Sequence, residues 1–133
     1  MFSPQMSRIS SLVAGLLLAA SALQIQALET IIQVSPNVLN ISSQGYVVTV
    51  HTDLPYSSVD VHSVFLNSVP IASSKADDQG NFVAKFDIEA VKRLDGLIIG
   101  ADNALMLTGV TCDGEPFVGT DWVRVINVVP RGR

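Results

Sequence analysis

Two histidines and one methionine, Met106, are the side chains of this 133-residue chain that most directly suggest a metal site. His51 and His62 are both expected on early strands. If those strands are neighbours, the two imidazoles and Met106 would form a ligand set suited to copper. The alternative is that both histidines lie at the surface or at a sheet edge. No Cys/His cluster and no pair of histidines one helical turn apart supports a metal, so we expect neither a metal nor another cofactor.

An acidic loop is the second candidate. Residues 77–81 read Asp-Asp-Gln-Gly-Asn, and their carboxylate and carbonyl oxygens are ligands of the kind that Ca²⁺ takes. A calcium site needs six to eight oxygens at roughly 2.3–2.6 Å. The alternating aspartates and the closing glutamate of a calcium loop are absent from this sequence. The pattern therefore favours a solvated hairpin loop.

Hydrolytic chemistry would need a base, an acid and a nucleophile held together. The chain offers these groups only as scattered residues, with no nucleophile elbow around any serine. They are His51 or His62, Asp53 or Asp60, and a serine from 57–58 or 73–74. We predict that the protein is not an enzyme and has no catalytic residues.

Cys112 is the single cysteine, so no internal disulfide can form. It also lies far from the N-terminus, which excludes a lipid-carrying first residue. Two interpretations remain for an unpaired cysteine in an exported protein. It is either an isolated thiol or a site for pairing with another chain.

The N-terminus resembles an export signal. Arg8 precedes an apolar run over residues 9–20, and small residues then allow cleavage after Ala22 or after Ala27. A membrane anchor is the alternative, but the run is shorter than the ~20 residues that a span needs. We predict a signal peptide over 1–27, one domain over 28–133, and a secreted or periplasmic location.

Charge limits the partners of the domain. Removing Arg8 with the leader leaves seven Lys or Arg against twelve Asp or Glu, a net charge of −5. An acidic domain without a basic cluster is poorly suited to nucleic acid or to an anionic membrane surface. We expect no nucleic-acid partner and no membrane span after the leader is removed.

Short alternating runs predict an all-β domain. Strands are expected over 29–34, 38–42, 46–53, 59–66, 69–72 and 82–87, followed by a C-terminal hairpin. A bulge near residues 62–63 would bring the apolar side chains of 59–66 to one face. Residues 73–81 are expected to form a polar loop, and 88–94 one helical turn capped by Asp87. About seven or eight strands with one helical turn favour an immunoglobulin-like β-sandwich, with a small closed barrel as the alternative.

The hairpin at 104–128 is the strongest single signal, because Asp113-Gly114 favours a chain reversal. A loop over 112–116 would place Thr111 opposite Phe117, Gly109 opposite Gly119 and Met106 opposite Trp122. The gap at the glycine pair would then admit a side chain such as Phe82 or Phe86. The predicted core face carries Leu105, Leu107, Phe117, Val123 and Val125.

Asp121 also falls on the predicted core face, where a carboxylate needs hydrogen-bond partners. The opposite face carries Met106, Val110, Val118 and Trp122. Cross-strand pairs contribute only about 0.2–1 kcal/mol each, too little to explain a tryptophan left in water. Either this face is an interaction surface, or residues 97–99 or the first strand cover it.

Several phrases occur in an order and spacing that resemble a known module. They are Pro36-Asn37-Val38-Leu39-Asn40, Ser43-Gln44-Gly45, Val83-Ala84-Lys85-Phe86-Asp87, Leu107-Thr108-Gly109 and Gly119-Thr120-Asp121. Nearly the whole domain is similar to an immunoglobulin-like module that recurs in bacterial secreted and cell-surface proteins. The resemblance implies a fold and no catalytic residues. The outer face of the last hairpin usually carries Thr, Ser and Glu in that module, and it is apolar in this chain.

Two binding functions follow as hypotheses. The first is an exported interaction or structural module that contacts another protein, or a second copy, through the outer hairpin face or a sheet edge. The second is a carbohydrate- or small-ligand-binding module, in which a sugar ring stacks on Trp122 together with Tyr46 or Tyr56.

Overall fold

Alternating apolar side chains sort the chain into two β-sheets. The structure is a computed structural model that describes residues 26–131. The predicted signal peptide therefore lies almost wholly outside the described residues. Between residues 26 and 131, no helix has the length and apolar character needed to cross a membrane.

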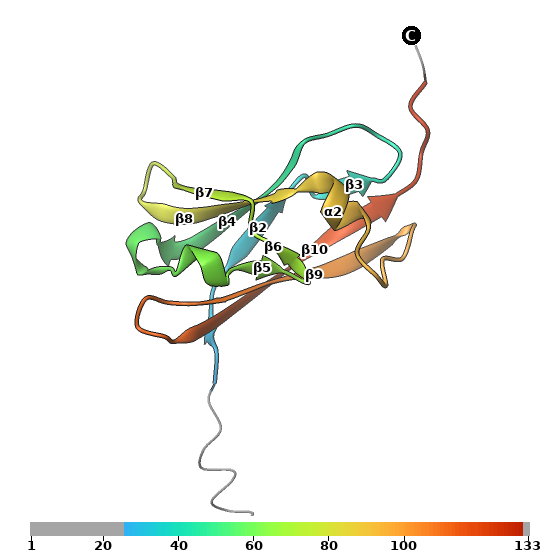
Figure 1. Ribbon diagram of the computed structural model, residues 1–133. Coiled ribbons are helices and arrows are strands. Elements are labelled where there is room, and N and C mark those ends of the chain that lie inside the picture. Colours follow the sequence, from blue (N-terminus) through green and yellow to red (C-terminus); the bar gives the residue numbers. More distant parts are fainter. Residues whose placement is uncertain (1–25, 132–133) are drawn as a thin grey trace, which may run out of the picture.

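The two sheets face each other (Figure 1). One has the order β1-β10-β9-β5-β6, with β3 also paired to β10, and the other has the order β2-β4-β8-β7. The strands are β1 (Leu28–Glu29), β2 (Ile32–Ser35), β3 (Val38–Asn40), β4 (Val47–Pro55), β5 (Phe65–Leu66), β6 (Val69–Pro70), β7 (Ser73–Ala76), β8 (Asn81–Asp87), β9 (Ala101–Val110) and β10 (Pro116–Ile126).

The predicted all-β sandwich is confirmed. The β2-β4-β8-β7 sheet opposes the sheet that contains β5, β9 and β10. The first of these sheets has four strands and the second has six. Because the strands divide into two separate sheets, the closed barrel is not the architecture of the described residues.

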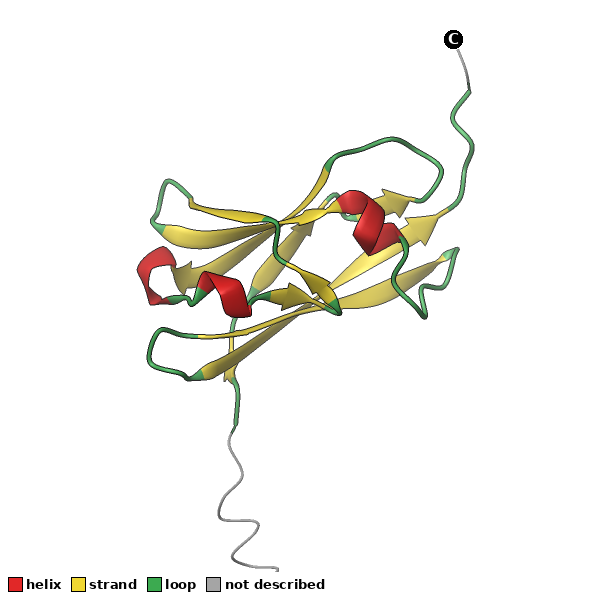
Figure 2. Ribbon diagram, in the orientation of Figure 1, coloured by secondary structure: helices red, strands yellow, loops and turns green. Residues whose placement is uncertain are grey.

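In the described part of the chain, residues 26–131, three short helices connect strands (Figure 2). They are the 3-10 turns η1 (Tyr56–Ser58) and η2 (Val61–Ser63) and the α-helix α2 (Ile88–Lys92). The Asp87 carboxylate accepts a hydrogen bond from the Glu89 N–H, as expected of an N-cap. Ile88 and Val91 bury one side of α2 against the core. The predicted helical turn is therefore present.

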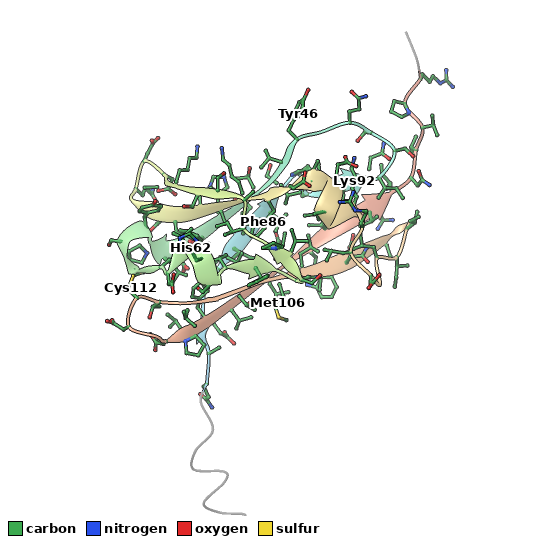
Figure 3. The ribbon with its side chains drawn as sticks, viewed as in Figure 1. Tyr46, His62, Phe86, Lys92, Met106 and Cys112 are labelled. Carbon is green, nitrogen blue, oxygen red and sulfur yellow. The ribbon has the colours of Figure 1, made fainter. Side chains whose placement is uncertain are left out.

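The core lies between the sheets. Inward residues of β4 and β8 meet those of β9 and β10, and Figure 3 shows Phe86 between the two layers. The fully buried large side chains include Phe82, Phe86, Phe117, Leu66, Leu105 and Leu107. Burying a side chain of this size stabilises a fold by about 1.5–3 kcal/mol, so packing alone can hold the domain together without a disulfide.

Three predicted elements differ from those observed, and two of them lie between residues 59 and 81. Residues 59–66 form no bulged strand, because η2 turns the chain before β5 begins. Val59, Val64 and Leu66 are nevertheless buried in the core, where the expected bulge would also have placed them. Residues 73–76 form the edge strand β7 rather than a loop. The structure thus has ten strands, more than the seven or eight predicted.

The first predicted strand, 29–34, is divided between the two sheets. β1 pairs with β10 in one sheet, and β2 pairs with β4 in the other. The linking residues are held on both sides: the Thr30 N–H donates to the Val118 carbonyl at 2.9 Å. The Asp53 carboxylate accepts from the Thr30 hydroxyl and from the Ile31 N–H.

Candidate functional site: the outer face of the C-terminal hairpin

The register of the β9–β10 hairpin decides which side chains meet on its surface. Val110 lies opposite Pro116, two residues before Val118, its predicted partner. The reversal is closed by the Thr111 N–H, which donates to the Glu115 carbonyl at 2.8 Å, and by Gly114 at φ 82°. The predicted loop 112–116 is therefore wrong, and residues 111–115 make the turn.

A shift of two residues changes the partners and preserves the faces, because side chains alternate with a period of two. The predicted core face is buried as expected, from Leu105 to Val125. Met106 faces Thr120, however, and Trp122 faces Ala104. The predicted Met106–Trp122 pair is thus a diagonal contact position rather than a direct one.

The predicted glycine pair is also absent. Gly109 lies opposite Phe117, whose ring covers it so closely that a Cβ would lie 2.6 Å from Phe117 Cζ. Gly119 lies against the segment that crosses between sheets, where a Cβ would lie 2.5 Å from Ile32 Cγ2. The space at each glycine is filled by these neighbours, and not by Phe82 or Phe86 as expected.

We define the outer face as Met106, Val110, Val118 and Trp122 together with Phe65 of the neighbouring strand β5. Trp122 is 62% exposed, Met106 44% and Phe65 39%. Val110 and Val118 are half-buried. Phe65 joins this face because it pairs with Thr108 of β9. Figure 3 shows Met106 projecting from its sheet, away from the other sheet.

Neither predicted cover lies over the outer face. Leu97 packs against the core, whereas Ile98 and Ile99 are exposed in the turn before β9. β1 pairs with the edge of β10 instead of crossing its surface. Within residues 26–131, the outer face is therefore open to solvent.

The outer face is uncharged along its centre and charged at one end. Between Asp102 and Val110, the outward residues of β9 are Ala104, Met106 and Thr108, and those of β10 are Val118, Thr120 and Trp122. Arg124 Nη1 lies 3.4 Å from Asp102 Oδ1 at the end of this row. Both of these side chains are more than half exposed.

Asp121 has the partners that its position requires. Its Oδ2 accepts from the Val34 N–H and its Oδ1 from the Trp122 N–H, each at 2.8 Å. The first bond joins β2 of one sheet to β10 of the other. The second joins the Asp121 carboxylate to the backbone of Trp122.

A groove of about 750 Å³ lies between β2 and β10, beside Trp122. Its polar lining includes Asp121, Gln33, Asn37 and His51. The sequence did not reveal this groove, because it exists only where the chain leaves β10 after β1, pairs with β4 as β2, and returns to β10 as β3. The signal that could have located it is Pro36, which interrupts the strand pattern between β2 and β3.

The structure does not bring Tyr46 or Tyr56 to Trp122. Tyr56, in η1, packs against Phe82 of β8, with ring centroids 6.1 Å apart and planes inclined at 32°. Tyr46 precedes β4 in the opposite sheet, and in Figure 3 it projects away from the side that bears Met106. Neither tyrosine therefore joins Trp122 in the stacking surface that the sequence suggested.

The other candidates remain separate. His51 lies on β4 opposite Gln33 of β2, whereas His62 lies in η2. Residues 26–131 contain no cluster of three potential His, Cys, Asp or Glu ligands. Asp77 Oδ1 accepts from the N–H groups of Gln79 and Asn81, both at 2.9 Å, which closes the acidic hairpin loop internally. Cys112 is exposed at the tip of the β9–β10 hairpin.

These features define a two-sheet all-β sandwich with an exposed apolar sheet face. No model of a protein family matches the chain, and no curated protein or solved structure matches it either. The outer face and its groove therefore provide the basis for the functional argument.

Proposed function

We propose that this protein is a non-enzymatic interaction or structural module, which contacts another protein through the outer face. The observation that carries the proposal is the exposure of Trp122 and Met106 beside Phe65 on an uncovered sheet. Contiguous apolar surface on a soluble domain commonly marks an interaction site. The leader-like N-terminus and the resemblance to bacterial immunoglobulin-like modules support a role in the periplasm or outside the cell.

Rigidity makes this surface suitable for binding. The same two strands that expose the outer face bury Leu105, Leu107, Phe117 and Val123 on their other side. A preorganised surface loses little conformational entropy when a partner binds. Tryptophan is also the residue most enriched among those that dominate binding energy at protein interfaces.

Trp122→Ala tests this function. We expect the variant to keep the wild-type cooperative unfolding transition, because Trp122 is not part of the core. A photo-crosslinking side chain at position 120, introduced in producing cells, should capture one defined partner, and Trp122→Ala should reduce that yield roughly tenfold or more. Tyr46→Ala is the matched control, since Tyr46 is an exposed aromatic residue away from the outer face. Equal yields from all three proteins would contradict the proposal.

The groove beside Trp122 favours a second candidate function, the binding of a neutral carbohydrate. An indole face next to amide, imidazole and carboxylate groups offers both stacking and directional hydrogen bonds. In this hypothesis Gln33, Asn37 and His51 take the place of the tyrosines that the sequence suggested.

Titration of the protein with neutral oligosaccharides, followed by amide chemical shifts, tests this alternative. Shifts should concentrate in residues 31–37 and at His51, and Gln33→Ala should weaken binding. Met106→Ala is the control, because Met106 belongs to the outer face and does not line the groove. Absence of saturable shifts, or equal weakening by both variants, would exclude the groove as a saccharide site.

A further inference from the structure

The cross-strand pairs of the outer face have complementary sizes and charges. Reading along the hairpin, the outward pairs are Val118 with Thr108, Met106 with Thr120, Trp122 with Ala104, and Arg124 with Asp102. The two central pairs each join a large side chain to a smaller one. The last pair joins opposite charges. Three of the four pairs are therefore complementary in size or charge across the line that separates β9 from β10, and Val118 with Thr108 joins two side chains of similar size.

We propose that the partner of the outer face is a second copy of this chain. The two copies pack face to face about a two-fold axis that runs along the strands between β9 and β10. This inference rests on the proposed function of the outer face as an interaction surface. It adds the identity of the partner and the orientation in which it binds.

The two-fold axis explains why the pairs matter. A rotation about a line between two strands places β10 of one copy over β9 of the other and keeps the level along the strands. Each residue then faces the second copy's version of its own cross-strand neighbour. Such an interface is isologous, so every contact occurs twice.

Size complementarity follows at the centre. Trp122 would lie over Ala104 of the second copy, where the small side chain leaves room for the indole. Met106 would lie over Thr120 of the second copy. A two-fold axis perpendicular to the strands, at the level of Met106 and Thr120, would instead place Trp122 against Val118 of the second copy. It would also place Ala104 against Thr108 of the second copy. Bulky side chains would then meet, and small ones would leave space between them.

Charge complementarity follows at the end of the face. Arg124 would face Asp102 of the second copy, and Asp102 would face the second copy's Arg124. Neither side chain is held by burial in the monomer, since both are more than half exposed. Although residues 28–133 carry a net charge of −5, the outward residues of β9 and β10 from 102 to 124 carry one positive and one negative charge and are neutral in sum. Like-charge repulsion is therefore avoided where the copies meet.

Ala104→Arg is the first test, because it adds bulk at the point where the second copy's Trp122 must fit. The side chain would extend into solvent in the monomer, so stability should be unchanged. Sedimentation equilibrium of the purified protein should show a dimer for wild type and a dissociation constant roughly tenfold or more higher for Ala104→Arg. Ala76→Arg is the matched control, as Ala76 is an exposed alanine on edge strand β7 of the other sheet.

Charge reversal is the second test and reports the orientation. Arg124→Asp alone and Asp102→Arg alone each place like charges together in a homodimer, and both should weaken association. An equimolar mixture should form heterodimers, because each reversed residue then meets an opposite charge on the other chain. Weakening of both single variants together with recovery in the mixture indicates that 124 of one copy meets 102 of the other, because an interface that brings 124 to 124 would give recovery without weakening either single variant.

The outcomes separate this inference from the function on which it rests. A wild-type protein that stays monomeric up to about 1 mM, or an Ala104→Arg dimer as tight as wild type, would overturn self-association. In that case crosslinking from position 120 to a different protein, lost in Trp122→Ala, would still support the proposed function. Failure of the mixed variants to associate, with both single variants weakened, would overturn the proposed orientation.

Discussion

At the scale of single residues, Asp53 shows how one carboxylate fixes the path of the chain. It accepts hydrogen bonds from the Thr30 hydroxyl and the Ile31 N–H, the two residues that cross from one sheet to the other. The Thr30 hydrogen bond is the main reason that the pKa of Asp53 lies below its ordinary value, and the Ile31 N–H adds to this effect. Hydrogen bonds to the charged form of a carboxyl group favour that form.

Thr30→Val should raise the pKa of Asp53 toward the ordinary value of about 3.9, because it removes the hydroxyl donor and keeps the shape of the side chain. In wild type, the folded pKa is below the unfolded one. The stabilisation is therefore complete above about pH 4 and is lost as the pH falls through the folded-state pKa.

Carboxyl ¹³C shifts of Asp53 against pH would measure the pKa in both proteins. Urea unfolding at pH 6 and pH 3 should show that the difference in stability between wild type and Thr30→Val is smaller at the lower pH. An unchanged Asp53 titration in Thr30→Val would contradict the assignment of the Thr30 hydrogen bond as the main cause.

At the scale of elements, alternation predicted which face each strand buries and did not predict where the strands begin or how they pair. The register of β9 and β10 moved by two residues without changing either face, so the apolar pattern could not distinguish the two registers. β7 was not predicted because Ser73–Ala76 contains no large apolar residue. It is a strand only because it pairs with β8.

The same reasoning explains the candidate site. Met106, Val110, Val118 and Trp122 lie together as predicted, because their positions follow from the period of two. Phe65 was missed because η2 replaces the strand expected around it. The groove was missed because the chain passes from one sheet to the other between β1 and β2. This crossing depends on hydrogen bonds to Asp53 and Asp121, which are distant from it in the sequence.

Asp121→Ala should loosen β2 from β10, because it leaves the Val34 N–H without its acceptor. An unsatisfied buried donor costs about 1–3 kcal/mol, and Val34 is almost fully buried. Amide hydrogen exchange at Val34 should accelerate along with this loss in urea-measured stability. Asp121→Asn is the control, since it retains one acceptor oxygen and should lose less. Unchanged protection of Val34 in Asp121→Ala would show that other contacts hold β2.

At the scale of the whole molecule, the two faces of one hairpin have different roles. The inner face supplies the core residues on which the β4–β8 sheet packs, and the outer face supplies the surface proposed to bind. The sequence predicted the class of fold because most of its short runs alternate between apolar and polar side chains. It did not predict the strand order, which arises from pairings such as β3 with β10 that join residues far apart in the chain.

One such pairing has a consequence for how the protein comes into being. β10 is bordered on one edge by β1 and β3, so the first and last described strands are neighbours. The sheet that carries the outer face cannot close until the last strand is available. Contacts between distant segments slow folding, because loop closure must precede the gain from pairing. A chain that emerges N-terminus first would therefore be unable to complete this sheet until almost all of it had been released, whereas every strand of the β2-β4-β8-β7 sheet would already be available.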